Sequence, residues 1–156
     1  MGNFKIDLKV GKIGEEKCLN FLNENEKVYE TVDVRNDKFW QMHDVDFIAT
    51  LKNGEIIKIE VKTDTLAHIT GNIAYEHTSN KYNKSMGCFK KTKADFIFYY
   101  LSQTDELYQI NMEMLRQYVD EHEFKDVNMG DMALGYLINI KILKENEIMG
   151  LISNNK

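Results

Sequence analysis

Apolar and polar residues alternate along residues 44–62, on both sides of a turn signal. The apolar positions are Val45, Phe47, Ala49 and Leu51 in the first half, and Ile57, Ile59 and Val61 in the second. Alternation with a period of two is typical of strands that have one face against a core. Residues 52–54 lie between the halves, and the Asn-Gly pair within them supplies the positive backbone angles of a tight hairpin. The stretch therefore predicts a β-hairpin.

The apolar positions also set the register of this hairpin. A two-residue loop at 53–54 would mix polar and apolar residues on both faces, which a half-buried hairpin does not tolerate. A three-residue loop with a left-handed glycine instead pairs Leu51 with Glu55, and Phe47 with Ile59. Extended along both strands, this register makes three further pairs: Val45 with Val61, Asp46 with Glu60, and Asp44 with Lys62.

The predicted register brings two carboxylates together on the polar face. Directly opposed Cβ atoms lie roughly 5 Å apart, and carboxylates so close repel unless a proton or a cation lies between them. Oxygen ligands on a rigid sheet suit a hard divalent ion such as Mg²⁺. The hairpin therefore predicts a metal site at Asp46 and Glu60, with Lys62 on the same face.

A helical pattern runs over residues 12–26. Its apolar stripe consists of Ile13, Cys18, Leu19 and Leu22. Glu15 lies three, four and seven positions before the last three of these residues, so it shares their inward face, whereas Glu16 points away. Glu15 is then either an acid stabilised by the positive end of a helix or a further carboxylate that reaches the metal site. Residues 1–10 are expected to be a ragged lead-in.

The rest of the chain alternates strands, helices and loops. Strands are predicted over 27–35, 95–101, 106–110 and 134–143, and a second helix over 111–121 with Asn111 as its N-cap. Residues 36–43 and 63–80 are predicted loops, the second with one short strand at 73–76, and 153–156 is a frayed end. The first loop holds Phe39 and Trp40, which either pack inside the protein or offer a surface for stacking on nucleotides.

Composition indicates a globular protein. The length of 156 residues suggests one domain over 1–156, and 43% hydrophobic with 11% aromatic residues excludes a disordered chain. No apolar run reaches the ~18 residues of a membrane span, and the charged start does not fit a signal peptide. Cys18 and Cys88 are most simply free thiols of a reducing, cytoplasmic compartment, although a bridge between them is the alternative.

Charge is unevenly distributed. The formal net charge of −5 argues against a strongly basic nucleic-acid coat. Between His77 and Ala94, however, there are five lysines and no acid: Lys81, Lys84, Lys90, Lys91 and Lys93. These lysines are either a local phosphate-binding surface that contacts the DNA backbone or solvated side chains on a loop.

The order of the acidic residues resembles the PD-(D/E)XK nuclease superfamily. Glu15 within Gly-Lys-Ile-Gly-Glu-Glu would be the helix carboxylate, Asp46 the motif aspartate, and Glu60 with Lys62 the (D/E)XK pair. The resemblance covers residues 11–101 and looks most like the Holliday-junction-resolvase-type and phage-type endonucleases. It implies an α/β fold with a restriction-endonuclease-like core, in which helices flank a central mixed β-sheet.

The resemblance implies a metal-dependent DNA endonuclease that cuts duplex or branched DNA. Asp46, Glu60 and the backbone carbonyl of Val61 would hold one Mg²⁺ or Mn²⁺ ion. Glu15 would ligate a second ion or orient a metal-bound water. Lys62 would stabilise the charge that builds up in the transition state. A homodimer would supply the two sites that cutting two strands needs.

Several assignments around this site have alternatives. The candidate accessory residues, which would support the metal or touch DNA, are Asp44, Asn72, Glu76 and His77. Asp44 alternatively replaces Asp46 as the metal ligand or simply holds Lys62, and His77, like His68, alternatively is an ordinary loop histidine. Two other functional classes stay open: a non-catalytic nucleic-acid- or protein-binding module that keeps the fold, and a small ligand-binding or structural domain with incidental acids.

Overall fold

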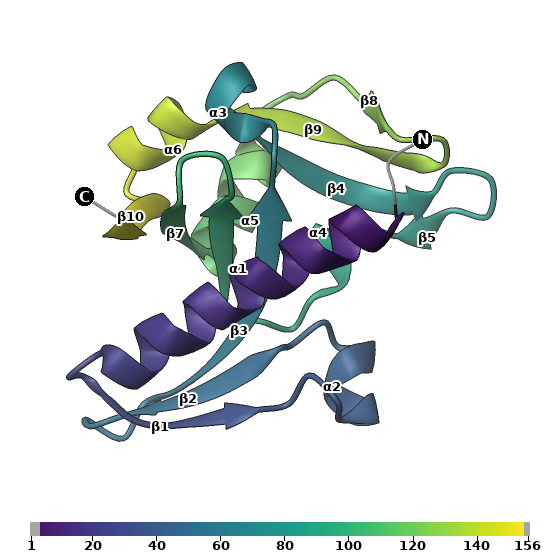
Figure 1. Ribbon diagram of the computed structural model, residues 1–156. Helices are drawn as coiled ribbons and strands as arrows, with labels where there is room; N and C mark the ends of the chain where they lie inside the picture. The colour runs from purple at the N-terminus through teal and green to yellow at the C-terminus, as the bar shows by residue number, and fades with distance from the viewer. Residues whose placement is uncertain (1–3, 155–156) are drawn as a thin grey trace.

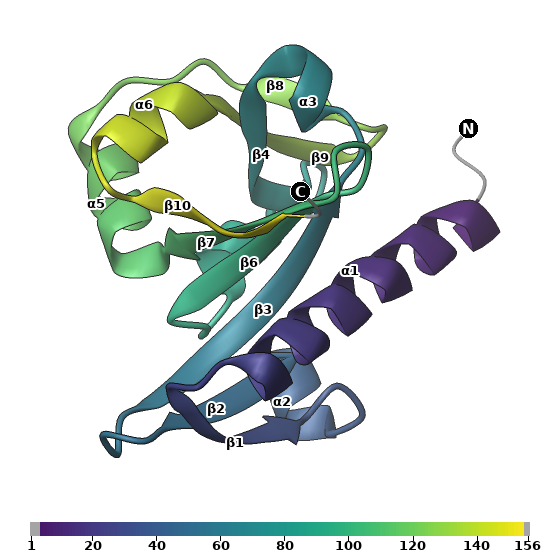
Figure 2. The same ribbon diagram turned by 60° about the vertical axis from the view of Figure 1, so that its left-hand side comes forward.

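Two β-sheets and six helices make up the computed structural model, which describes residues 4–154 (Figures 1 and 2). The first sheet contains β1 (Val28–Asp33), β2 (Phe47–Leu51), β3 (Ile56–Asp64), β6 (Phe96–Leu101), β7 (Glu106–Asn111) and β10 (Met149–Asn154). The second contains β4 (Asn72–Asn80), β5 (Ser85–Met86), β8 (Val127–Met129) and β9 (Ala133–Asn139). The helices are α1 (Phe4–Glu24), α2 (Lys38–Met42), α3 (Ala67–Thr70), α4 (Cys88–Lys91), α5 (Met112–Glu121) and α6 (Ile140–Glu145).

The first sheet is mixed, with strand order β1-β2-β3-β6-β7-β10, and the second is antiparallel, with order β5-β4-β9-β8. Only β3 and β6 run parallel among the described strand pairs. The predicted α/β fold with a central mixed sheet flanked by helices is therefore confirmed. Within residues 4–154, none of the helices has the length and apolar character that crossing a membrane requires.

The β2–β3 hairpin has the register that its apolar positions predict. Phe47 pairs with Ile59, and the Leu51 amide donates to the Glu55 carbonyl at 2.7 Å. Gly54 has a φ of 89°, in the left-handed region that the three-residue loop requires. The hairpin, its loop and its central pairs are confirmed.

The ladder shifts by one residue where β2 begins. The Asp46 amide donates to the Ile59 carbonyl at 2.8 Å, not to Glu60, and the paired residues of the two strands end at Phe47 and Ile59. The predicted directly opposed pairs, Asp46 with Glu60 and Asp44 with Lys62, are therefore wrong.

Packing shows the physical reason for this shift. Val45 lies in a small cluster with Val34 and Ala94, whereas Val61 packs with the core under α1. The predicted contact of Val45 with Val61 is thus also wrong. Asp44, which precedes Val45, adopts a φ of 52° and turns the chain. Val45 is therefore buried beside Ala94, and the β2–β3 pairing does not extend further.

Helix α1 crosses the first sheet close to β3 (Figure 2). It begins by Phe4, so the expectation of a ragged lead-in is wrong from that residue on, while residues 1–3 lie outside the described part. Cys18 and Leu22 are buried against the sheet as predicted. Gly14 is buried where the helix meets β3, and a Cβ there would collide with the Thr63 hydroxyl. This close approach places Glu15 beside the hairpin.

Segment 63–80 is more regular than its sequence pattern indicates. It contains the end of β3, the short helix α3 and the nine-residue strand β4. Ile73, Tyr75 and His77 alternate inward along β4, but a polar histidine at a buried position hides the period. The prediction of a loop with one short strand is wrong here, because pairing with β9 orders residues 72–78 as a long strand.

The remaining elements include both confirmed and mistaken predictions. β6, β7 and α5 match the predicted strands and helix, and the Asn111 side chain accepts the Met114 amide at 3.0 Å as an N-cap. The predicted strand 134–143 is instead β9 followed by α6, which Asn139 caps. Helix α2 replaces part of the loop 36–43, and β8 and β10 were not predicted. Of the frayed end, residues 155–156 lie outside the described part.

Candidate active site

The C-terminal half of β3 has one open edge. β3 pairs with β2 only as far as Ile59, but it continues to Asp64 and pairs with β6 over that length. No described strand occupies the β2 side of this segment. A cavity of about 290 Å³ opens here, lined by α1 and β3 residues that include Glu15, Val61 and Lys62. Of the predicted catalytic and metal-binding residues, Glu15, Val61 and Lys62 line this cavity.

Glu60 is the most buried acid of the site. It is 4% exposed, and its Oε1 lies 2.8 Å from Lys62 Nζ, because the alternation of β3 puts both side chains on one face. Its other oxygen, Oε2, is buried without a hydrogen-bond partner among the described residues. Burial raises the pKa of Glu60 to about 7, although Lys62 and the neighbouring Thr92 hydroxyl oppose that shift. A second positive charge at Oε2 would therefore stabilise the ionised form.

Lys62 is charged and only one third exposed, with 33% of its side chain accessible. Burial disfavours its ammonium, but the Glu60 carboxylate outweighs burial and raises the pKa of Lys62. The thiol of Cys88 is a further neighbour: burial raises the pKa of Cys88 to about 11, and Lys62 acts against that rise. Cys88 and Cys18 are free thiols, so the alternative of a bridge between them is wrong.

A backbone amide of β3 fixes the Asp46 carboxylate. Its Oδ2 accepts the Val61 amide at 2.7 Å, which replaces the ladder hydrogen bond lost at the shift. Burial raises the pKa of Asp46; the Val61 hydrogen bond lowers it, the negative charge of Glu15 raises it further, and Lys62 lowers it. The structure thus brings Asp46, Glu15 and Lys62 within electrostatic reach of one another around Val61.

Glu15 has a partner that the sequence reading missed. The Arg35 guanidinium donates to Glu15 Oε2 at 2.8 Å and also pairs with Asp33 at 2.7 Å. It lies 5.1 Å from the centre of the Phe47 ring. Arg35 is one of only two arginines in the chain, and it lies just after β1, in the segment that leads to the β2–β3 hairpin. This position is the one signal in the sequence that could have pointed to it.

Asp44 lies on the Glu60 side of the site without a direct bond to Lys62. Its carboxylate is 3.8 Å from Lys91 Nζ, and its carbonyl accepts the Thr92 hydroxyl at 2.8 Å. Its negative charge contributes to the raised pKa values of both Glu60 and Lys62. Asp44 is therefore an electrostatic neighbour of Glu60 and Lys62, and it contacts the C-terminal end of α4.

The remaining accessory candidates lie along β4. His77 is buried, with Nε2 2.8 Å from Asp126 and Nδ1 2.8 Å from the Thr78 hydroxyl, which is the environment of a structural histidine. Glu76 lies near enough to Cys88 to contribute to the raised pKa of that thiol. Asn72 starts the strand at its far end, opposite Asn139.

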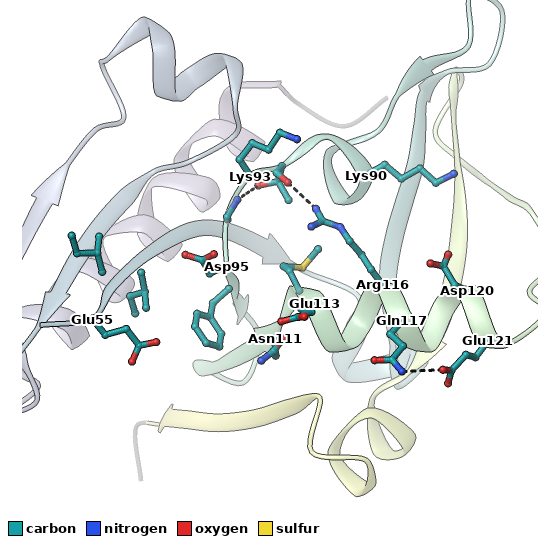
Figure 3. A pocket seen from close by; sticks show the side chains of 16 residues that line it. Glu55, Lys90, Lys93, Asp95, Asn111, Glu113, Arg116, Gln117, Asp120 and Glu121 are labelled. Atoms are coloured by element: carbon teal, nitrogen blue, oxygen red, sulfur yellow. Dashed lines mark hydrogen bonds between the residues drawn. The ribbon is translucent and has the colours of Figure 1, made fainter. Parts of the chain in front are cut away.

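The five predicted DNA-binding lysines occupy separate places. Lys81 and Lys84 belong to the β4–β5 hairpin, and Lys91 faces Asp44. Lys90 and Lys93 line a wide cavity of about 870 Å³ between α4, α5 and the start of β3 (Figure 3). That cavity also contains the acids Glu55, Asp95, Glu113, Asp120 and Glu121. Its mixed charge does not match a phosphate backbone.

The donor set at the open edge fits a hard divalent ion. Within residues 4–154, no group of three or more histidine, cysteine, aspartate or glutamate side chains is clustered as a metal cage. Mg²⁺, however, is commonly bound by one or two carboxylates and keeps several waters. Glu60, whose Oε2 has no hydrogen-bond partner among the described residues, and the half-buried Asp46 would each supply one such carboxylate.

The fold is similar to that of a known nuclease. The structure of a bacterial homing endonuclease, I-Ssp6803I, matches with a TM-score of 0.51 and 16% sequence identity, over 75% of this chain and 74% of that chain. No protein-family model and no curated protein matches the sequence. At this identity the similarity shows a shared fold.

Proposed function

We propose that this protein is a metal-dependent DNA endonuclease of the PD-(D/E)XK type, with its active site at the open edge of β3. The observation that carries the proposal is the Glu60 carboxylate: Oε1 lies 2.8 Å from Lys62 Nζ, and Oε2 is buried without a hydrogen-bond partner among the described residues. An unsatisfied buried acceptor costs about 1–3 kcal/mol, and a bound cation would remove that cost. The fold shared with a homing endonuclease supports the same reading.

Asp46, Glu60 and the Val61 carbonyl would hold one Mg²⁺ or Mn²⁺ ion, and Glu15 would hold a second ion or orient a water. When bound, the ion would polarise the scissile phosphate and make hydroxide available near neutral pH. The Val61 amide fixes the Asp46 carboxylate, and Arg35 fixes that of Glu15. These contacts pre-organise the acids before substrate arrives.

Lys62 would bind the phosphate oxygen that gains charge in the transition state. The Glu60 carboxylate keeps the ammonium charged and holds it toward the site. Water would attack phosphorus in line and expel the 3′ oxygen, which leaves a 5′-phosphate and a 3′-hydroxyl. A homodimer would provide the second site for the opposite strand.

A cleavage assay tests this proposal. Supercoiled plasmid, linear duplex and a four-way junction are incubated with Mg²⁺, Mn²⁺ or EDTA, for wild type, Glu60→Gln and Lys62→Ala. Glu55→Gln is the matched control, because Glu55 directly precedes the same strand, β3, but is exposed. We expect metal-dependent cutting that both site variants lose and the control keeps. Equal cutting by wild type and Glu60→Gln would refute the assignment, and binding without any cutting would favour a non-catalytic module.

A further inference from the structure

The hairpin between β4 and β5 leads directly into the proposed active site. β5 ends at Met86, and α4 begins at Cys88, whose thiol neighbours Lys62. Between them, the Gly87 amide donates to the His77 carbonyl at 2.9 Å. A Cβ at Gly87 would lie 2.6 Å from the Glu76 carbonyl oxygen, so only glycine allows this contact. The hairpin is thus attached rigidly beside the site.

Hydrogen bonds within the hairpin hold its tip in one shape. The Asn80 side chain accepts the amides of Tyr82 and Asn83, at 3.0 and 3.4 Å. The Asn83 side chain in turn accepts the Ser85 amide at 3.0 Å. The Lys81 amide donates to a carbonyl of the neighbouring β8–β9 hairpin, that of Met132, at 2.8 Å. These hydrogen bonds give the tip, residues 80–86, a defined conformation.

This ordered tip exposes two large apolar side chains. Tyr82 is 76% exposed and Met86 is 60% exposed. Lys81 Nζ lies 5.6 Å from the centre of the Tyr82 ring, a cation–π contact that holds a positive charge over the aromatic face. Nothing in the described part of the fold covers these side chains. A rigid tip that displays an aromatic ring, a methionine and lysines is suited to contact with another molecule.

The charge of the tip indicates what that molecule is. Lys81 and Lys84 flank Tyr82, and the chain contains no acid from Thr78 to Ala94. A polyanion complements this surface, and proteins that distort DNA insert apolar side chains such as methionine between base steps. Aromatic rings also stack on bases regardless of sequence.

Resting on the proposed function, we propose that residues 80–86 enter a groove of duplex DNA beside the scissile phosphate. Tyr82 and Met86 would contact the bases, and Lys81 and Lys84 the flanking phosphates. The site would thereby select DNA that can be unstacked next to the cleaved bond, such as flexible pyrimidine–purine steps.

Binding measured without cleavage tests this inference. Fluorescence anisotropy with a labelled duplex in EDTA compares wild type with Tyr82→Ala and Met86→Ala. Tyr29→Ala is the matched control, because Tyr29 is 75% exposed but lies on β1 beside Glu30. We expect Kd to rise at least about fivefold for Tyr82→Ala, with no change for the control. Lys81→Gln and Lys84→Gln should each lose one phosphate contact. Each is expected to reduce the steepness of the slope of log K against log salt concentration by about one.

A second readout reports the geometry of insertion. A 2-aminopurine base near the cleavage position should brighten when wild type unstacks it, and Tyr82→Ala should lose that signal. If wild type binds and cuts DNA but Tyr82→Ala behaves as Tyr29→Ala does in both assays, the inference is wrong and the nuclease assignment stands. If wild type neither binds nor cuts DNA, the proposed function itself fails.

Discussion

The Arg35 guanidinium donates to Glu15 Oε2 at 2.8 Å and so joins the segment after β1 to helix α1. The same guanidinium pairs with Asp33, and these carboxylates raise the pKa of Arg35 further above its ordinary value. Glu15 is therefore held in place by a permanently charged partner. Since the proposed mechanism needs the Glu15 carboxylate near Asp46, we expect Arg35 to be a positioning residue for the proposed site.

Replacing Arg35 by alanine should lower kcat about 10- to 100-fold, which is the usual effect of losing a group that orients a metal-site ligand. The apparent Mn²⁺ affinity, measured by titration of activity, should fall with it. Asp33→Asn is the control, because it removes a different acidic partner of Arg35 and leaves Glu15 unchanged. An Arg35→Ala enzyme with wild-type Mn²⁺ dependence would show that the pair only stabilises the fold.

Glu60 should make stability depend on pH in the metal-free protein. Burial raises its pKa from 4.5 to about 7, so between those values the folded state retains a proton that the unfolded chain has released. Unfolding free energy should therefore fall as pH rises through this window, by on the order of 2 kcal/mol. Urea unfolding at pH 5, 6, 7 and 8 measures the slope. Glu60→Gln should flatten it, and an unchanged slope in that variant would contradict the assignment.

Mg²⁺ should stabilise the protein more at pH 8 than at pH 6. A carboxylate must be deprotonated to bind the ion, and ligand that binds only the folded state raises Tm. Thermal unfolding with and without saturating Mg²⁺ checks this without any substrate. Asp46→Asn and Glu60→Gln should each remove the Tm shift, whereas Glu55→Gln should keep it. A shift of equal size in all four proteins would place the ion elsewhere.

Gly14→Ala should destabilise the fold because the added Cβ collides with the Thr63 hydroxyl. Overpacking of this kind costs about 1–3 kcal/mol. Gly11→Ala is the matched control: it lies in the same helix, with no atom near the added Cβ, and should stabilise by up to about 1 kcal/mol. Urea unfolding compares the two. A neutral Gly14→Ala would mean that the contact of α1 with β3 adapts freely.

Local pattern was sufficient for the parts of this protein whose geometry is set by neighbours in the chain. The hairpin, its three-residue loop and the pairing of Phe47 with Ile59 follow from apolar alternation and one Asn-Gly turn. The N-cap at Asn111 follows from side-chain chemistry that acts within one helical turn. These elements also placed Glu60 and Lys62 on one face.

Only the tertiary structure decided how the side chains of the candidate site are arranged. Because Val45 is buried beside Ala94, Asp46 does not pair with Glu60 as predicted, and its carboxylate instead accepts the Val61 amide. Arg35 reaches Glu15 across 20 positions of sequence, and β9 orders β4 from a distant part of the chain. Such contacts depend on which surfaces meet after folding, and hydrophobic periodicity describes only the face that a segment buries, not the partner that covers it.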